Sequence, residues 1–134
     1  RLYAADAAAP RGHTILIEPL NHYDAPGYFL SHTEIARRII EAVGAPNLKL
    51  MFDCYHIQIL EGDLARRIDA NLDITGHIQF AGVPSRGRPD MGEVNYAHIF
   101  AHLAARGYDA PLGAEYRPEA GNTDASLGWM AALR

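Results

Sequence analysis

The sequence is poor in the residues that mark several classes of protein. Among its 134 residues there is a single cysteine, Cys54, and a single lysine, Lys49. One cysteine excludes an internal disulfide framework and is typical of a reducing compartment. No apolar run approaches the roughly 20 residues that a membrane-spanning helix needs, and no signal peptide is recognisable. We therefore expect a cytoplasmic protein with no membrane partner.

An excess of basic residues is also missing. Twelve Lys and Arg face sixteen Asp and Glu, for a formal net charge of -4 at pH 7. Nucleic-acid-binding proteins usually carry a basic patch or stripe. The pairs Arg37-Arg38 and Arg66-Arg67 lie in helical patterns, where a solvated helix face is the favoured interpretation. We therefore expect no nucleic-acid partner.

What the sequence does contain is a regular alternation of strand-like and helix-like segments, enough for one ordinary domain. β-rich runs are found at residues 14–20, 47–53, 76–81 and 110–116. Helical patterns are found at residues 31–44, 63–72, 96–106 and 123–133, and residues 2–9 resemble the end of a further helix. Ser31 and Glu34 predict a capping box for the first of these helices, and Asn95 predicts the cap of the third.

This alternation predicts an α/β fold with parallel strands joined by right-handed crossovers. Two architectures satisfy it, an open doubly wound sheet and part of a (β/α)8 barrel. An eight-unit barrel needs about 250 residues, so four units in 134 residues amount to about half of one. The connections that follow strands are the longer ones, notably residues 82–94. Long loops on that side build the active-site face of parallel α/β folds.

One polar residue interrupts each apolar run near its carboxyl end: Glu18, Asp53, Gln79 and Glu115. A charged side chain in such a setting is costly unless it is paired or binds a metal. Three carboxylates and one amide oxygen form a hard-oxygen ligand set suited to Mg²⁺ or Mn²⁺. The alternative is that some of these residues form internal ion pairs with basic side chains.

The alternation of side chains along a strand supports a shared orientation for this set. If Asp53 points inward, so do Lys49 and Met51, whereas Leu48, Leu50 and Phe52 meet the helices. Glu115 would then have Gly113 as its inward neighbour, which leaves room there.

Two further residues are candidates for substrate binding. His56 lies just past Asp53, at the mouth of the predicted site, and a solvent-facing loop histidine is the alternative. Arg86 in the long loop could hold an anionic or hydroxylated substrate, with simple exposure as the alternative. Weaker candidates are Asn21, Tyr55, Glu93 and Tyr116. His77 is interpreted as an interior histidine and Cys54 as a buried small apolar residue.

Several stretches together resemble a known family. They are "ILIEPLN", "NLKLMFDCYHIQILEGDLARRI", "GHIQFAGVPSRGRPDMGEVNY" and "GAEYRP". They are similar to the C-terminal half of hydroxypyruvate isomerases, a branch of the xylose-isomerase-like (β/α)8 barrels, and the related 2-oxo-tetronate isomerases share the pattern. The resemblance implies that residues 1–134 are the last four βα units of a single barrel domain.

The resemblance also implies an activity and a cofactor. The expected reaction interconverts hydroxypyruvate and tartronate semialdehyde through an enediolate stabilised by Mg²⁺ or Mn²⁺. Glu18 and Glu115 match the two glutamates that relay the proton and touch the metal, and Asp53 and Gln79 match the remaining ligands. Related ketose 3-epimerases carry histidine where Gln79 stands, which favours the hydroxypyruvate isomerase branch.

His56 and Arg86 match positions near the substrate in the wider superfamily. A small hydroxy- or oxo-acid is therefore the expected ligand, and homo-oligomerisation is left open. Three rival functions remain at this point: a related sugar isomerase or epimerase, an inactive half barrel or binding module, and an endonuclease-IV-like enzyme. The acidic charge balance argues against the last of these.

Overall fold

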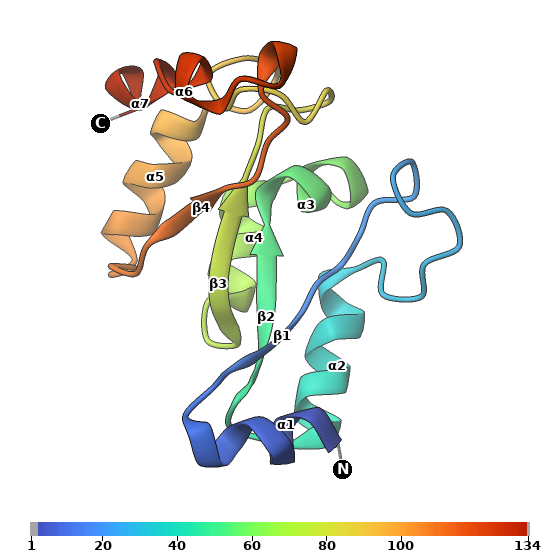
Figure 1. Ribbon diagram of the computed structural model, residues 1–134. Helices are drawn as coiled ribbons and strands as arrows, with labels where there is room; N and C mark the ends of the chain where they lie inside the picture. Colours follow the sequence, from blue (N-terminus) through green and yellow to red (C-terminus); the bar gives the residue numbers. More distant parts are fainter. Residues whose placement is uncertain (1–2, 134) are drawn as a thin grey trace.

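The strands of the protein form one parallel sheet. The computed structural model describes residues 3–133, and its sheet has the order β1-β2-β3-β4 (Figure 1). Each strand pairs with its sequence neighbour in parallel orientation. The strands are β1 (Ile15–Ile17), β2 (Leu48–Asp53), β3 (Thr75–Phe80) and β4 (Leu112–Ala114). All four predicted strands are therefore present, with the outer two shorter than expected.

Helices precede, connect and follow these strands. The α-helices are α1 (Tyr3–Ala8), α2 (Thr33–Val43), α3 (Cys54–Leu60), α4 (Leu64–Asn71), α5 (Tyr96–Ala105), α6 (Thr123–Ser126) and α7 (Trp129–Ala132). Two 3-10 turns, η1 (Ala9–Arg11) and η2 (Glu119–Gly121), complete the described elements. Within residues 3–133, no helix has both the length and the apolar character that crossing a membrane requires.

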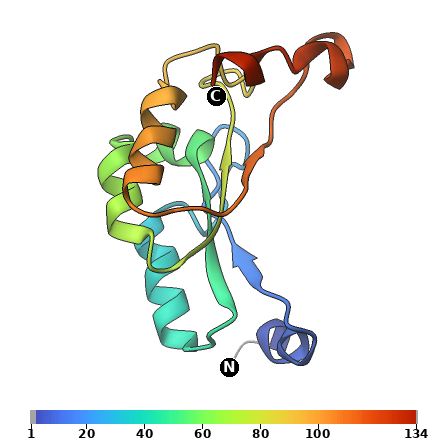
Figure 2. The same ribbon diagram turned by 90° about the vertical axis from the view of Figure 1, so that its left-hand side faces the viewer.

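The helices cover only one face of the sheet. Figure 2 shows α2, α4 and α5 side by side along that face, and none of the helices in the described range lies across the other. A doubly wound sheet would carry helices on both faces. Sequential parallel strands with helices on one side are the arrangement of half a (β/α)8 barrel. The structure therefore decides between the two predicted architectures in favour of the barrel.

The two faces of the sheet differ as the strand pattern predicts. Leu48, Leu50 and Phe52 are at most 1% exposed and belong to the core beneath the helices. On the opposite face, a Cβ atom added to Gly113 would lie 2.8 Å from Nε2 of His77. The absence of a side chain at Gly113 is thus what lets the neighbouring strand carry a histidine there.

The start of α2 differs from the prediction. Ser31 does not cap it; the helix begins at Thr33 after His32, which makes no side-chain capping bond. Instead Glu61, 28 residues away, accepts the backbone N–H of Thr33 at 2.7 Å and its hydroxyl at 3.0 Å. A carboxylate at a helix N-terminus accepts from an otherwise unpaired N–H group and interacts favourably with the positive end of the helix dipole. The predicted cap of α5 is confirmed, since Asn95 accepts the N–H of His98 at 3.1 Å.

Two other helical predictions need correction. The single helix expected over residues 123–133 is wrong, because α6 and α7 are separate short helices. The Tyr116 hydroxyl contacts Ser126 of α6 at 2.6 Å and accepts from the Trp129 indole of α7 at 3.2 Å, which ties both helices to the end of β4. The second correction is α3, a helix that follows β2 immediately where the sequence pattern indicated a connection.

Candidate active site and metal centre

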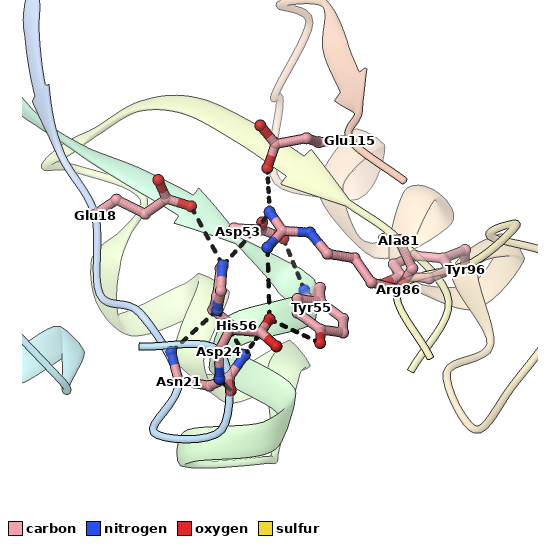
Figure 3. Close-up of polar contacts among 10 residues, drawn as sticks. All are labelled: Glu18, Asn21, Asp24, Asp53, Tyr55, His56, Ala81, Arg86, Tyr96 and Glu115. Atoms are coloured by element: carbon pink, nitrogen blue, oxygen red, sulfur yellow. Dashed lines mark hydrogen bonds and ion pairs between the residues drawn. The ribbon is translucent and has the colours of Figure 1, made fainter. Parts of the chain in front are cut away.

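The four polar residues of the predicted constellation all lie at the carboxyl end of the sheet. Glu18 follows β1, Asp53 is the last residue of β2, and Glu115 follows β4. Gln79 lies beside Asp53 in the β2–β3 register. Figure 3 shows the three carboxylate groups gathered at this end. Parallel strands bring their carboxyl ends to the same end of the sheet, so residues far apart in sequence become neighbours.

Asp53 has different tasks for its two carboxylate oxygens. The residue is 1% exposed. Oδ1 accepts the backbone N–H of Tyr55 at 2.9 Å, which is the N-cap contact that starts α3. Oδ2 is buried and has no hydrogen-bond partner among the described residues. The helix start therefore orients the carboxylate and leaves one oxygen free.

Three unpartnered polar atoms meet at this point. They are Oδ2 of Asp53, Oε1 of Glu18 and Nε2 of His56, all buried. Nε2 lies 3.9 Å from each of the two oxygens, and the three atoms all lie within 4.8 Å of one another. An unsatisfied buried polar atom costs about 1–3 kcal/mol. Three of them around one space indicate a site built to receive a ligand.

His56 is positioned by α3 and by the loop after β1. It lies in the first turn of α3 and is 1% exposed, so the alternative of a solvent-facing loop histidine is wrong. Its Nδ1 accepts the backbone N–H of Asn21 at 3.0 Å. The other ring nitrogen, Nε2, faces Glu18 and Asp53 (Figure 3).

Arg86 enters the site from the long loop between β3 and α5. Its guanidinium contacts the Glu115 carboxylate. It lies 3.7 Å from Oδ2 of Asp53 and 3.5 Å from Oδ2 of Asp24. It also lies 5.0 Å from the centroid of the Tyr55 ring. The side chain is 19% exposed. Simple exposure is therefore wrong for Arg86. Part of the ion-pair alternative holds, because Asp53 and Glu115 do meet a basic side chain.

The backbone around Arg86 is held in an unusual conformation. Its φ is +55°, in the left-handed region that non-glycine residues rarely adopt. Its carbonyl accepts the N–H of Arg117 at 2.7 Å, which joins the loop to the segment after β4. The loop closes on itself through a bond of 2.9 Å from the Gly82 N–H to the Gly87 carbonyl. A conformation that costs about 1–3 kcal/mol persists only where its surroundings enforce it, so the guanidinium is presented by a fixed loop.

Asp24 is a site residue that the sequence did not predict. Its Oδ2 accepts the Tyr55 hydroxyl at 2.9 Å and the Asn21 amide at 3.1 Å, in addition to its ion pair with Arg86. Asn21 in turn accepts the backbone N–H groups of Tyr23 and Asp24, both at 3.0 Å. The available signal was an asparagine directly after a strand with an acid three residues later, a pattern typical of an Asx turn.

The charges in the site are strongly perturbed. Burial, together with repulsion from Asp53 and Glu115, raises the pKa of Glu18 to about 7. Burial raises the pKa of Asp53 to about 6. Burial and the Arg86 charge lower the pKa of His56 to about 4. The site therefore holds a neutral histidine between two carboxyl groups whose pKa values are raised. This is the expected result where burial outweighs the stabilisation that nearby positive charge gives to the ionised carboxylates.

The described residues fit a divalent cation. Glu18 and Asp53 each direct an unpartnered buried oxygen into the space where His56 also points. Carboxylate oxygens are preferred ligands of Mg²⁺ and Mn²⁺. Glu115 is 51% exposed and bound to Arg86, so it stands apart from this group of three. The structure thus brings Glu18, Asp53, His56 and Arg86 together and places Glu115 on the far side of the guanidinium.

A separate cavity lies at the other end of the sheet. A cavity of about 550 Å³ is found at the amino ends of the strands, between η1, the start of β1 and the turn after α2. Asp6, His13 and Asn47 are among the residues that line it, and none of the predicted site residues does. We place the candidate site at the carboxyl end because its unpartnered ligating atoms lie there.

Comparison with known proteins gives related matches over nearly the whole chain. The model of the family described as "xylose isomerase-like TIM barrel" matches residues 2–133. A 2-oxo-tetronate isomerase of Cupriavidus necator is 52% identical over 128 residues, covering 96% of this chain and 49% of that protein. The hydroxypyruvate isomerase of Escherichia coli is 40% identical over 132 residues, covering 98% of this chain and 51% of that protein.

A solved structure agrees with these matches. The crystal structure of a protein named as an AP endonuclease of family 2, from Brucella melitensis, is 44% identical in sequence, with a TM-score of 0.91. The alignment covers 98% of this chain and 51% of that one. The chain spans about half the length of the curated relatives and of the solved structure that it matches.

Proposed function

Because the chain belongs to the xylose isomerase-like TIM barrel family, we propose that its protein is an isomerase that interconverts hydroxypyruvate and tartronate semialdehyde. The observation that carries the proposal is the group of three unpartnered atoms on Glu18, Asp53 and His56, with the Arg86 guanidinium 3.7 Å from Asp53. Such a site offers ligands for a cation and a positive group for a substrate carboxylate.

The metal is assigned by the chemistry of the donors. Glu18, Asp53, Gln79 and Glu115 are the proposed ligands of Mg²⁺ or Mn²⁺, since all four offer oxygen. For Glu115 to take part, its carboxylate has to leave Arg86, which a substrate carboxylate could bind instead. When bound, the cation would offset negative charge that develops on the substrate oxygens.

The reaction moves two hydrogens within the substrate. One proton leaves C3 of hydroxypyruvate, next to the C2 carbonyl, and a proton is returned to C2; the hydroxyl proton passes from O3 to O2. Glu18 and Glu115 are the proposed groups that take and return the carbon-bound proton. They follow β1 and β4, at opposite edges of the sheet, and their different surroundings suit one acid and one base.

His56 and Arg86 are the proposed substrate-binding residues. Arg86 would bind the carboxylate shared by both substrates, because a guanidinium can hold a carboxylate through two parallel hydrogen bonds. His56 points into the space between Glu18 and Asp53, where a substrate oxygen would lie. Both side chains are held by neighbouring residues, Arg86 against Tyr55 and His56 against Asn21.

The complete site belongs to a complete barrel. We infer that residues 1–134 supply the last four βα units of one barrel domain, in keeping with the half-length coverage of the relatives. Activity is then a property of the closed barrel, because four strands leave both edges of the sheet unpaired. Sedimentation and activity of the chain alone test this point: an active assembly of paired chains would support a reassembled barrel, an inactive monomer would support a half barrel, and an active monomer would contradict the inference.

A second substrate is favoured by one comparison. The relative with 52% identity is a 2-oxo-tetronate isomerase, against 40% for the hydroxypyruvate isomerase. A four-carbon 2-oxo-acid presents the same carboxylate, carbonyl and hydroxyl to the site. The same residues would therefore serve either substrate.

The decisive experiment is an NMR assay of the intact protein with a panel of three- and four-carbon hydroxy-oxo-acids, with and without EDTA. We expect exchange of the carbon-bound proton and conversion that EDTA abolishes. The variant Glu115→Gln should lose turnover; near-normal turnover would remove Glu115 from the mechanism. An assay for cleavage of abasic DNA with Zn²⁺ should be negative, and strong cleavage would favour the endonuclease activity for which the Brucella melitensis relative is named.

A further inference from the structure

His56 meets two nitrogen donors from one residue. The backbone N–H of Asn21 points at Nδ1 of His56 at 3.0 Å, and the side-chain amide nitrogen of Asn21 lies 2.8 Å from the same atom. A backbone N–H can only donate, so Nδ1 has to accept. Nδ1 therefore carries no proton.

The orientation of the Asn21 amide agrees with this assignment. Its oxygen accepts the backbone N–H groups of Tyr23 and Asp24, each at 3.0 Å. Its nitrogen donates to the Asp24 carboxylate at 3.1 Å. Exchanging the oxygen and nitrogen would set donor against donor at the first two contacts and acceptor against acceptor at the third. The amide thus presents N–H, and not oxygen, to the ring.

From these contacts we propose that Asn21 is a positioning residue that holds His56 as the neutral tautomer with its proton on Nε2. A neutral imidazole has one N–H, and with Nδ1 accepting, that N–H is on Nε2. An imidazolium would direct a second N–H at the two donors of Asn21. Both ring nitrogens are therefore assigned by a residue 35 positions away.

This assignment changes what His56 can do in the site. A protonated Nε2 has no free lone pair, so it cannot bind the metal, although it lies within ligand distance of Glu18 and Asp53. It is instead a neutral hydrogen-bond donor aimed into the space between those two carboxylates. We infer that the cation is held by oxygen ligands alone and that His56 donates to a substrate oxygen that gains negative charge. The substrate role rests on the proposed function; the tautomer does not.

The tautomer is measured directly by nitrogen NMR. Long-range ¹H–¹⁵N correlation of the ¹⁵N-histidine-labelled intact protein at pH 7.5 (about one unit above the ordinary histidine pKa) distinguishes protonated from unprotonated ring nitrogens. The His56 signals are assigned by their loss in His56→Gln. We expect an unprotonated Nδ1 and a protonated Nε2, unchanged when Mg²⁺ is added to saturation. A protonated Nδ1, an imidazolium pattern, or loss of the Nε2 proton on adding Mg²⁺ would overturn the proposal.

The variant Asn21→Asp tests the cause. It keeps the oxygen that accepts from Tyr23 and Asp24 and replaces the amide donor with a carboxylate oxygen near Nδ1. We expect His56 to shift toward the form protonated on Nδ1, and kcat to fall by about 10- to 100-fold with a smaller change in KM, the scale expected when a partner that orients a working histidine is lost. An unchanged His56 spectrum in a folded Asn21→Asp protein would remove the Asn21 side-chain amide from this role and leave the backbone N–H as the determinant.

Asn47→Ala is the matched control. The Asn47 amide also lies beside a histidine, but it donates to the backbone carbonyl of His13 and not to a ring. Its loss should leave the His56 spectrum and kcat unchanged.

If Asn21→Asp does not fold, the spectrum of the unaltered protein still decides the tautomer. If the protein lacks isomerase activity while His56 carries its proton on Nε2, the proposed function fails and the tautomer assignment stands.

Discussion

The two ends of the sheet are built from different kinds of charge contact. At the carboxyl end, Asp53 and His56 are almost fully buried, and each keeps one polar atom without a partner among the described residues. At the amino end, Asp69 pairs with Arg106 at 2.8 Å and with His102 at 2.8 Å, on a surface open to solvent. The carboxyl-end site thus contains oxygen and nitrogen atoms without hydrogen-bond partners among the described residues, whereas the charged groups at the amino end pair with each other.

The difference shows where the fold retains unfavourable electrostatics. Burial of an unpaired charge is costly, whereas exposed ion pairs contribute only about 0–1 kcal/mol. A chain selected for stability alone would not keep the arrangement around Asp53. In barrels of this kind, substitutions at the carboxyl end are expected to change activity, and those at the amino end to change stability. The following predictions test that division, beginning with the largest expected effect.

Asp53→Asn should separate activity from stability. The change keeps an oxygen that can accept the Tyr55 N–H but removes a proposed metal ligand. We expect turnover and Mg²⁺ affinity to fall by more than about 100-fold, beyond the scale seen for residues that only support a ligand. The metal-free variant should unfold at higher denaturant than the parent at pH 8, since a buried carboxylate whose Oδ2 has no hydrogen-bond partner among the described residues is gone.

Its matched control is Asp69→Asn at the amino end. That substitution should leave turnover unchanged and barely shift the urea concentration at the unfolding midpoint, because exposed ion pairs contribute little to stability. Calorimetry measures the Mg²⁺ affinity of each variant, and urea unfolding measures its stability. Equal losses of activity in both variants would contradict the division between the ends.

Arg86→Lys should reduce kcat/KM by on the order of 10- to 100-fold, because charge-assisted hydrogen bonds are worth roughly 1.5–3 kcal/mol and lysine lacks the forked geometry of arginine. Steady-state kinetics with a substrate lacking the carboxylate should show a smaller loss. Arg106→Lys is the control at the amino end, where the arginine pairs with Asp69 and kcat/KM should not change. A similar loss with both substrates would show that Arg86 does not bind the carboxylate.

The metal-free protein should become less stable as the pH rises from about 5 to 8. The pKa values of Glu18 and Asp53 are raised to about 7 and about 6, so the folded chain keeps two protons that the unfolded chain releases near pH 4. His56 acts in the opposite direction, since its pKa is lowered to about 4 and the unfolded chain binds its proton below about 6.5. Two carboxyl protons against one histidine proton give a net loss of stability with rising pH.

Urea unfolding at several pH values measures this slope. Saturating Mg²⁺ should flatten it, because a cation ionises both carboxyl groups, and Mg²⁺ affinity should weaken below about pH 7. The variant Glu18→Gln should lose the part of the slope that Glu18 contributes between its ordinary pKa of 4.5 and its raised pKa of about 7. A slope that is the same in Glu18→Gln and in the parent would contradict the assignment to this residue.

Glu61→Ala should have the smallest effect of the four. Glu61 lies at the carboxyl end but only caps α2 and pairs with Arg67 at 3.2 Å. Loss of the cap should lower the free energy of unfolding by about 1 kcal/mol, with turnover per folded molecule unchanged. A change in kcat would extend the functional region beyond the residues around Asp53.

The strand ends illustrate what local pattern can predict. An apolar run that ends in a carboxylate was visible at Glu18, Asp53 and Glu115, and the structure places all three at the carboxyl end of the sheet. The side-chain alternation that assigned Leu48, Leu50 and Phe52 to the helix side also holds. These features depend on the two-residue period of a strand, because successive side chains point to opposite faces and a buried face requires apolar residues at alternate positions.

Contacts between distant segments account for what was not predicted. Asp24 joins the site through Tyr55 and Arg86, which lie 31 and 62 positions further along the chain. Glu61 replaced the local cap expected at Ser31, from 28 residues beyond Thr33. Neither contact has a signature within one helix or one strand, because each exists only once two loops have been brought together.

The sequence by itself therefore determined the parallel α/β order and the polar residue that each strand carries to its carboxyl end. Only the tertiary structure decided how those residues divide their work: which Asp53 oxygen is free, that Glu115 meets Arg86, and which His56 nitrogen faces the site. The physical reason is that periodicity acts along one segment, whereas the direction of a hydrogen bond depends on a partner that folding alone supplies.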